Sequence, residues 1–110
     1  MKRRPTAKIK FKYFDDVPDD FTGTCFILKD RVVCHFVNGK LHREGAPAVF
    51  SEDKQSWFIH GKLHREDGPA CIQYGREEFA LHGKLMTKAK LELAKLAMKL
   101  KNITTTEMTK

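Results

Sequence analysis

Residues 58–70 read FIHGKLHREDGPA, and related phrases stand 22 residues before and after this stretch. FVNGKLHRE spans residues 36–44 and ALHGKLM spans residues 80–86, so Gly39, Gly61 and Gly83 share one column of a 22-residue period. The dipeptides Pro47-Ala48 and Pro69-Ala70 recur at the same spacing. Several aligned columns in one register indicate a true tandem repeat. Extended backwards, the period predicts a more divergent first copy that begins near Phe21.

Each copy is typical of strands joined by tight turns. Asn38-Gly39 lies between apolar runs, and this pair is the strongest short-range hairpin signal because both turn residues need positive φ. His60-Gly61 and His82-Gly83 take the same place, and His tolerates that conformation better than most side chains. We expect further turns at Lys29-Asp30, Glu52-Asp53 and Tyr74-Gly75. The predicted fold class is therefore mainly β, an antiparallel meander of tandem 22-residue hairpin repeats.

Both faces of the predicted sheet are apolar. Two-residue turns place Phe36 opposite Leu41 and Phe58 opposite Leu63. One face would then stack Ile27, Phe36, Leu41, Val49, Phe58, Leu63 and Leu85, and the other would carry Leu28, Val37, Phe50, Trp57, Ile59, Ile72, Phe79 and Leu81. Because neither face can simply be left in water, we expect something to cover each.

The two ends of the chain differ from the repeats. Residues 8–13, KIKFKY, alternate strictly, which predicts a strand within a basic N-terminal segment of residues 1–16. Lysines along such a strand also discourage edge-to-edge pairing. Residues 87–103 predict a helix with Thr87 as N-cap, packed on one sheet face to close the core, followed by a flexible tail at 104–110. The apolar stripe of this helix comprises Ala89, Leu93, Leu96, Leu100 and Ile103.

Length and charge place the chain among single-domain cytoplasmic proteins. At 110 residues, the whole chain, 1–110, is expected to form one domain. The net charge of +7 belongs to the ends: residues 1–14 hold six basic residues and no acid, whereas residues 15–83 hold eight basic and twelve acidic residues. No apolar run reaches the roughly 18 residues of a membrane span, and no signal peptide is evident. Cys25, Cys34 and Cys71 are therefore expected to be reduced thiols.

The units NGKLHRE and HGKLHREDGPA, with the aromatic pair Trp57-Phe58 before the turn, resemble the MORN-like hairpin repeats of small tailed-phage and bacterial proteins. The lead-in VPDDFTGTC, residues 17–25, resembles the segment that opens such arrays. The resemblance covers residues 17–86 as three repeats, and it implies a twisted, largely single-layer sheet with a binding rather than a catalytic role. The first copy departs from the pattern with VVCH at residues 32–35, and the last copy lacks His-Arg. Any role tied to His-Arg would therefore be carried by His42, Arg43, His64 and Arg65.

The titratable residues do not form a recognisable catalytic or metal-binding motif. His60 and His64 lie on different strands around a turn rather than on one helix face, and there is no Cys-x-x-Cys, so we expect no metal site. Cys34 and His35 are adjacent, so their side chains point to opposite faces of a strand. We expect no catalytic residue, no cofactor and no small-molecule substrate. Cys25 and Cys34 face each other across a hairpin, either as small buried hydrophobes or as a redox pair.

The favoured interpretation is a non-enzymatic interaction protein, encoded by a phage and acting in the host cytoplasm. It would bind and modulate a host protein, or associate with itself as a homodimer, through the sheet face that the helix leaves uncovered. The predicted partner-binding residues are Phe50, Trp57, Ile59, His42, Arg43, His64 and Arg65. The alternative is a nucleic-acid-binding protein that uses the basic N-terminal strand and the C-terminal helix. Its contact residues would be Lys8, Lys10, Lys12, Lys95 and Lys99.

Overall fold

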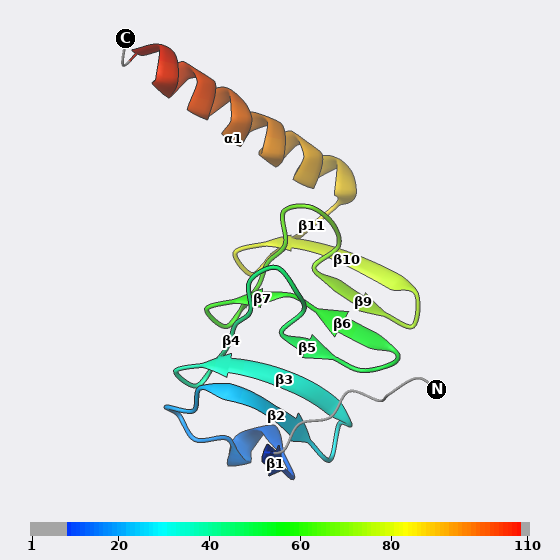
Figure 1. The fold of residues 1–110 in the computed structure, drawn as a ribbon. Coiled ribbons are helices and arrows are strands. Elements are labelled where there is room, and N and C mark those ends of the chain that lie inside the picture. Colours follow the sequence, from blue (N-terminus) through cyan, green and yellow to red (C-terminus); the bar gives the residue numbers. More distant parts are fainter. Residues whose placement is uncertain (1–8, 109–110) are drawn as a thin grey trace.

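The computed structural model describes residues 9–108, with side chains placed for residues 9–100. Within this range the fold is mainly β with one C-terminal helix, as the sequence predicted. The strands lie one above another along the length of the molecule (Figure 1). The elements are β1 (Ile9–Phe11), the 3-10 helix η1 (Phe14–Asp16), β2 (Gly23–Ile27), β3 (Val32–Val37), β4 (Lys40–Leu41), β5 (Val49–Phe50), β6 (Lys54–Ser56), β7 (Phe58–Ile59), β8 (Lys62–Leu63), β9 (Cys71–Gln73), β10 (Arg76–Leu81), β11 (Lys84–Met86) and α1 (Lys88–Met108).

The three copies follow one plan. The strand order in the large sheet is β1-β2-β3-β5-β6-β9-β10-β11, with β4 beside β3, while β7 and β8 form a separate two-stranded sheet. In each copy a strand is followed by a turn, a longer extended segment, a second turn and a short strand. The long segments are β3, then β6 with β7, and then β10. Since these segments begin at residues 32, 54 and 76, the 22-residue period of the sequence is also the period of the sheet.

Four of the six predicted turns have positive φ at both central residues, whereas the turns at Lys29-Asp30 and Glu52-Asp53 do not. Asn38 has φ of 50° and Gly39 of 76°, and the pairs His60-Gly61, Tyr74-Gly75 and His82-Gly83 repeat these values closely. Positive φ at both central residues is the type I′ geometry, whose twist matches that of the flanking strands. The expected register follows, because Phe36 lies opposite Leu41 and Phe58 lies opposite Leu63.

One strand departs from the antiparallel meander. β1 pairs with β2 in parallel, with Ile9 opposite Cys25 and Phe11 opposite Ile27. Residues 12–22, which include η1, carry the chain back to the start of β2, so both strands run the same way. The antiparallel meander predicted for the repeats is confirmed, and the N-terminal strand, whose direction the sequence did not indicate, joins its edge in parallel.

Residues 9–22, called the N-terminal segment from here on, cover the apolar core. Buried residues gather on one side of the sheet, here called the core face, and comprise Cys25, Ile27, Val32, Cys34, Phe36 and Val49. Phe11, Val17 and Phe21 pack against this cluster together with Leu41 and Phe58. The Phe21 ring meets the rings of Phe11 and Phe36 edge-on, with centroids 5.5 Å and 6.0 Å away. The first copy and the segment before it thus build the core, a role that we had expected of the C-terminal helix.

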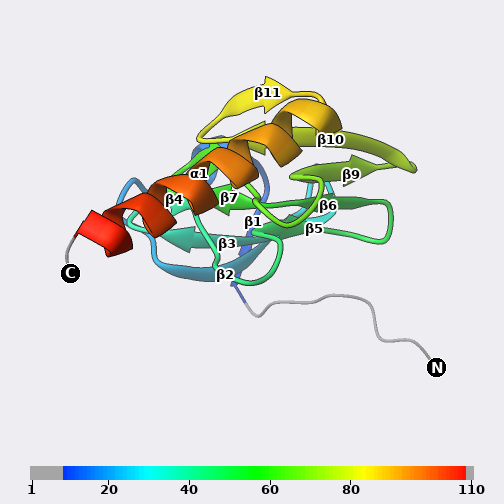
Figure 2. The ribbon, with the colours of Figure 1, turned by 90° about the horizontal axis from the view of Figure 1, so that it is seen from above.

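Helix α1 begins as predicted, with the Thr87 Oγ1 accepting a hydrogen bond of 3.2 Å from the Lys90 N–H. It starts beside β11 and runs obliquely away across the end of the stack (Figures 1 and 2). Leu91 is buried, whereas Leu93, Leu96 and Leu100 are exposed, so the helix packs on the sheet only near its start.

The helix is longer than the sequence indicated. It continues to Met108, past the end at residue 103 that the sequence predicted, while the flexibility expected of residues 104–110 stays a prediction. Each residue added to an existing helix forms one more backbone hydrogen bond. The three threonines at residues 104–106 do not interrupt this series. Among residues 9–108 no helix is both long and apolar enough to cross a membrane.

Candidate partner-binding surface

The repeated histidines connect one repeat to the next. His42 Nδ1 accepts a hydrogen bond of 2.9 Å from the backbone N–H of His60, and His64 Nδ1 accepts one of 2.9 Å from the N–H of His82. In both pairs the imidazole rings lie 4.5 Å apart. Because a backbone N–H can only donate, the Nδ1 atom of each accepting ring carries no proton. The histidine of the KLH motif therefore holds the turn of the following repeat.

The repeated arginines hold the loop that joins one copy to the next. Arg43 donates to the carbonyl of Pro47 at 3.4 Å, and Arg65 donates to the carbonyl of Pro69 at 3.1 Å. The Arg65 guanidinium also stacks on the Trp57 ring, 3.9 Å from its centroid. Its Nε donates to Asp67 at 3.0 Å, and this hydrogen bond lowers the pKa of the Asp67 carboxyl. These contacts fix the loop that passes from one copy to the next.

The structure therefore gives most of the predicted partner-binding residues an intramolecular role. His42, Arg43, His64 and Arg65 are half-buried, as are Trp57 and Ile59. Phe50 is different because it lines a groove on the side of the sheet away from the core face. Neighbouring residues of a strand point to opposite faces, so Phe26, Val33 and Phe50 project away from Cys25, Cys34 and Val49.

We call this concavity the hairpin groove. It has a volume of about 640 Å³ and is lined by Phe26, Leu28, Asp30, Arg31, Val33, Phe50, Ser51, Glu52, Asp53 and Tyr74. Its floor is a row of facing residues, because Phe26 lies opposite Val33 and Val33 lies opposite Phe50. Its walls come from the turns between β2 and β3, between β5 and β6, and between β9 and β10.

The hairpin groove is apolar at its floor and acidic at its rim. Leu28 is 47% exposed and Tyr74 is 74% exposed, so large apolar groups are open to solvent beside the buried Val33. The rim carries three carboxylates, from Asp30, Glu52 and Asp53, and one cation among the lining residues, from Arg31. This combination suits a ligand that brings apolar side chains and positive charge.

The sequence interpretation included Leu28 and Phe50 but omitted Phe26, Val33 and Tyr74. A signal for two of them was present. Phe26 alternates with Cys25 and Ile27, and a turn centred on Lys29-Asp30 sets it opposite Val33. Tyr74 was interpreted only as a turn residue, and nothing local indicates that its side chain reaches the groove.

The lysines of the nucleic-acid alternative are not brought together. Lys10 lies in β1 and Lys12 just after it, at one end of the stack, whereas Lys95 and Lys99 lie on α1 at the other end (Figure 1). The longest dimension of the molecule is 53 Å. Lys8 lies outside the described residues. These residues therefore do not form one continuous basic surface.

The cysteines are buried thiols. Cys25 and Cys34 lie opposite each other, as the turn position predicted, and both are free and fully buried. Burial raises the pKa of Cys25 and raises that of Cys34 to about 12. A thiol that stays protonated is a poor nucleophile, which favours the interpretation as small buried hydrophobes. Within the described residues no group of three or more His, Cys, Asp or Glu side chains is placed to hold a metal ion.

Comparison with known proteins adds no family to this description. No protein-family model matches the chain, and no curated protein or solved structure is significantly similar to it. The resemblance to MORN-like repeats stays a prediction.

Proposed function

We propose that this chain is a non-enzymatic interaction protein whose hairpin groove binds a segment of a partner protein. The observation that carries the proposal is a row in which the partly exposed Phe26 and Phe50 flank the buried Val33, with Leu28 and Tyr74 exposed at its edges. On the core face, by contrast, Phe11, Val17 and Phe21 pack against the buried cluster. A concave surface that combines apolar side chains with charged groups at its rim is a common form of binding site.

The rim sets the chemistry of the partner. Asp30, Glu52 and Asp53 favour a segment that carries Lys or Arg beside its apolar side chains, and they repel phosphate groups. The groove therefore supports a protein partner over a nucleic acid. A homodimer related by a two-fold axis through this groove would set the acidic rims of two copies against each other, so we propose a different protein as the partner.

The biological setting follows from the resemblance to phage-encoded hairpin repeats. We propose that the protein acts in the cytoplasm, and in that of the host if it is phage-encoded. There it would modulate a host protein by occupying a basic, apolar segment of that protein. The proposal assigns no reaction to the chain.

Selection from a library of random short peptides tests this function. Peptides are enriched on the wild-type protein and then measured against Phe50→Thr and Tyr74→Asn. Threonine keeps the strand propensity of position 50, and asparagine tolerates the positive φ at position 74. Phe14→Ala is the control, since Phe14 is exposed on η1 and does not line the groove.

We expect enriched peptides that combine aromatic or aliphatic residues with Lys or Arg. Each groove variant should weaken their binding by about tenfold, equivalent to roughly 1.4 kcal/mol, and the control should leave it unchanged. Failure to enrich any peptide, or binding that survives both groove variants, would contradict the proposal.

A further inference from the structure

Helix α1 presents a second apolar surface, which is separate from the hairpin groove. Leu93 is 66% exposed, Leu96 is 53% exposed and Leu100 is 56% exposed. Leu91, by contrast, is 1% exposed against the sheet, and the half-buried Ala94 and Lys95 lie on its side of the helix. At about 100° per residue, Leu93, Leu96 and Leu100 point within about 40° of the direction opposite to Leu91. The helix thus packs on the sheet through the face that carries Leu91, and it exposes the opposite face, which carries Leu93, Leu96 and Leu100.

The exposed residues have the spacing of a coiled-coil seam. Ala89, Leu93, Leu96 and Leu100 are separated by four, three and four residues, and we call these four residues the α1 seam. A stripe confined to this heptad spacing is narrower than the apolar face of a helix that lies on a core or in a membrane interface. Its flanks also carry no aromatic residue between positions 88 and 100, whereas aromatic residues commonly anchor helices at membrane surfaces. The geometry therefore suits a single partner helix.

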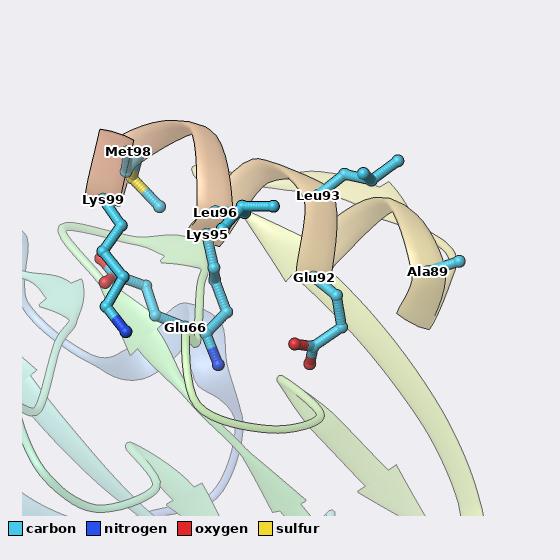
Figure 3. Close-up of a pocket in the computed structure, with 8 residues that line it drawn as sticks. All are labelled: Glu66, Ala89, Glu92, Leu93, Lys95, Leu96, Met98 and Lys99. Atoms are coloured by element: carbon cyan, nitrogen blue, oxygen red, sulfur yellow. The ribbon is translucent and has the colours of Figure 1, made fainter. Parts of the chain in front are cut away.

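The surface beside the α1 seam is hollowed. A groove of about 830 Å³ is lined by Glu66, Ala89, Glu92, Leu93, Lys95, Leu96, Met98 and Lys99, so three of the four seam residues border it. Figure 3 shows Glu92, Lys95 and Lys99 reaching toward the turn that carries Glu66, whereas Leu93 points away from that turn. Glu66 is itself paired with His64 Nε2 at 3.3 Å. A helix seated on the seam would also cover this hollow.

Charge decides between a second copy and a different partner. Residues 88–101 contain five lysines and one glutamate. Lys90 and Lys99 flank the seam together with Glu92, so two copies of α1 packed along their seams would bring a net positive charge together. Like charges beside a coiled-coil seam disfavour pairing. A helix with Glu or Asp at the flanking positions would instead gain complementary contacts along its length.

We propose that the α1 seam binds an acidic amphipathic helix of a partner protein in two-helix, coiled-coil-type packing. The 21 residues of α1 span about 31 Å, which matches a partner helix of about three heptads. The inference is independent of the hairpin groove, and both sites can be occupied at once because Phe50 and Leu93 line different hollows.

The test uses two synthetic peptides of three heptads with Ile and Leu in the seam positions, one flanked by Glu and the other by Lys. Binding to the full chain is followed by fluorescence anisotropy at low and moderate salt. The double variant Leu93→Gln/Leu96→Gln keeps residues of good helix propensity and removes the seam. Leu85→Gln is the matched control, since Leu85 is 61% exposed but lies on β11.

We expect the Glu-flanked peptide to bind and the Lys-flanked peptide not to bind. The double variant should weaken binding at least about tenfold, and the control should not change it. Phe50→Thr should also leave this binding intact, so failure of the groove and failure of the seam are distinguishable. Absence of binding by the Glu-flanked peptide, or equal binding of both peptides, would overturn the proposal.

Two further outcomes would replace it. A dimer in light scattering that the double variant converts to a monomer would assign the seam to a second copy. Binding to anionic lipid vesicles that depends on the seam, without binding of the Glu-flanked peptide, would assign it to a membrane surface.

Discussion

His64 Nδ1 lies 2.9 Å from the backbone N of His82, and His42 stands in the same relation to the backbone N of His60. The histidine of one copy thus satisfies a polar group in the turn of the next copy. The pairing recurs at the period of the sheet, which gives a physical reason for a histidine at this position of the repeat.

Replacing His64 with alanine should destabilise the fold. The change removes the acceptor of the His82 N–H and the ring that contacts the His82 imidazole, and we expect the free energy of unfolding to fall by about 1–2 kcal/mol. Urea denaturation measures this change. Glu66→Ala is the control, because Glu66 is exposed and should contribute less than about 0.5 kcal/mol. Equal stability of His64→Ala and the wild type would show that the bond between repeats is unimportant.

Gly39 should be far less tolerant of a side chain than Gly45, although both have φ near 77°. A Cβ at Gly39 would overlap the backbone carbonyl of Asp19, whereas a Cβ at Gly45 would meet nothing within 4 Å. Gly45→Ala should cost about 1–2 kcal/mol from the backbone conformation. Gly39→Ala should cost more than about 3 kcal/mol, because the N-terminal segment must move. Similar thermal midpoints for the two variants would contradict this view of the first turn.

Stability should fall as the solution becomes alkaline. Burial raises the pKa of Cys34 to about 12 in the folded protein, whereas an unfolded cysteine titrates near about 8.5. Between these values the unfolded chain binds fewer protons than the folded chain, so the free energy of unfolding decreases with rising pH, by up to about 1.4 kcal/mol per pH unit. Urea denaturation at several pH values should show a shallower slope for Cys34→Ala than for the wild type. Identical slopes would mean that Cys34 titrates normally when folded.

The thiols should count as three free groups. Cys25 and Cys34 are fully buried and Cys71 is half-buried, so a thiol reagent should label Cys71 first and the other two only on unfolding. Counting in denaturant before and after mild oxidation should give three thiols in both cases. Loss of two thiols after oxidation would instead support a Cys25–Cys34 redox pair.

The repeat and its turns could be predicted because they depend on local chemistry. Asn38-Gly39 and His60-Gly61 need positive φ at both residues, which few sequences allow, and the turn then fixes the facing pairs. Which residues cover the core face could not be predicted in the same way. Phe21 packs on Phe36 through contacts that depend on the path of the whole N-terminal segment, and its own neighbours in sequence do not reveal that path.

The surfaces that we propose for binding were predicted only in part for a similar reason. The sequence showed that His42, Arg43, His64 and Arg65 recur, but their hydrogen-bond partners appear only when the repeats are stacked. In α1, apolar residues occur around much of the helix, so the pattern did not show that Leu91 would be buried and Leu93 exposed.

The most direct test of the hairpin groove as the partner-binding site is an amide NMR spectrum of the protein titrated with a peptide selected on the wild type. We predict that the largest shifts fall at Phe26, Val33, Phe50 and Tyr74, which lie in three strands and one turn that meet only in the folded groove. Largest shifts along α1 or on the N-terminal segment, with these four residues unchanged, would contradict the account.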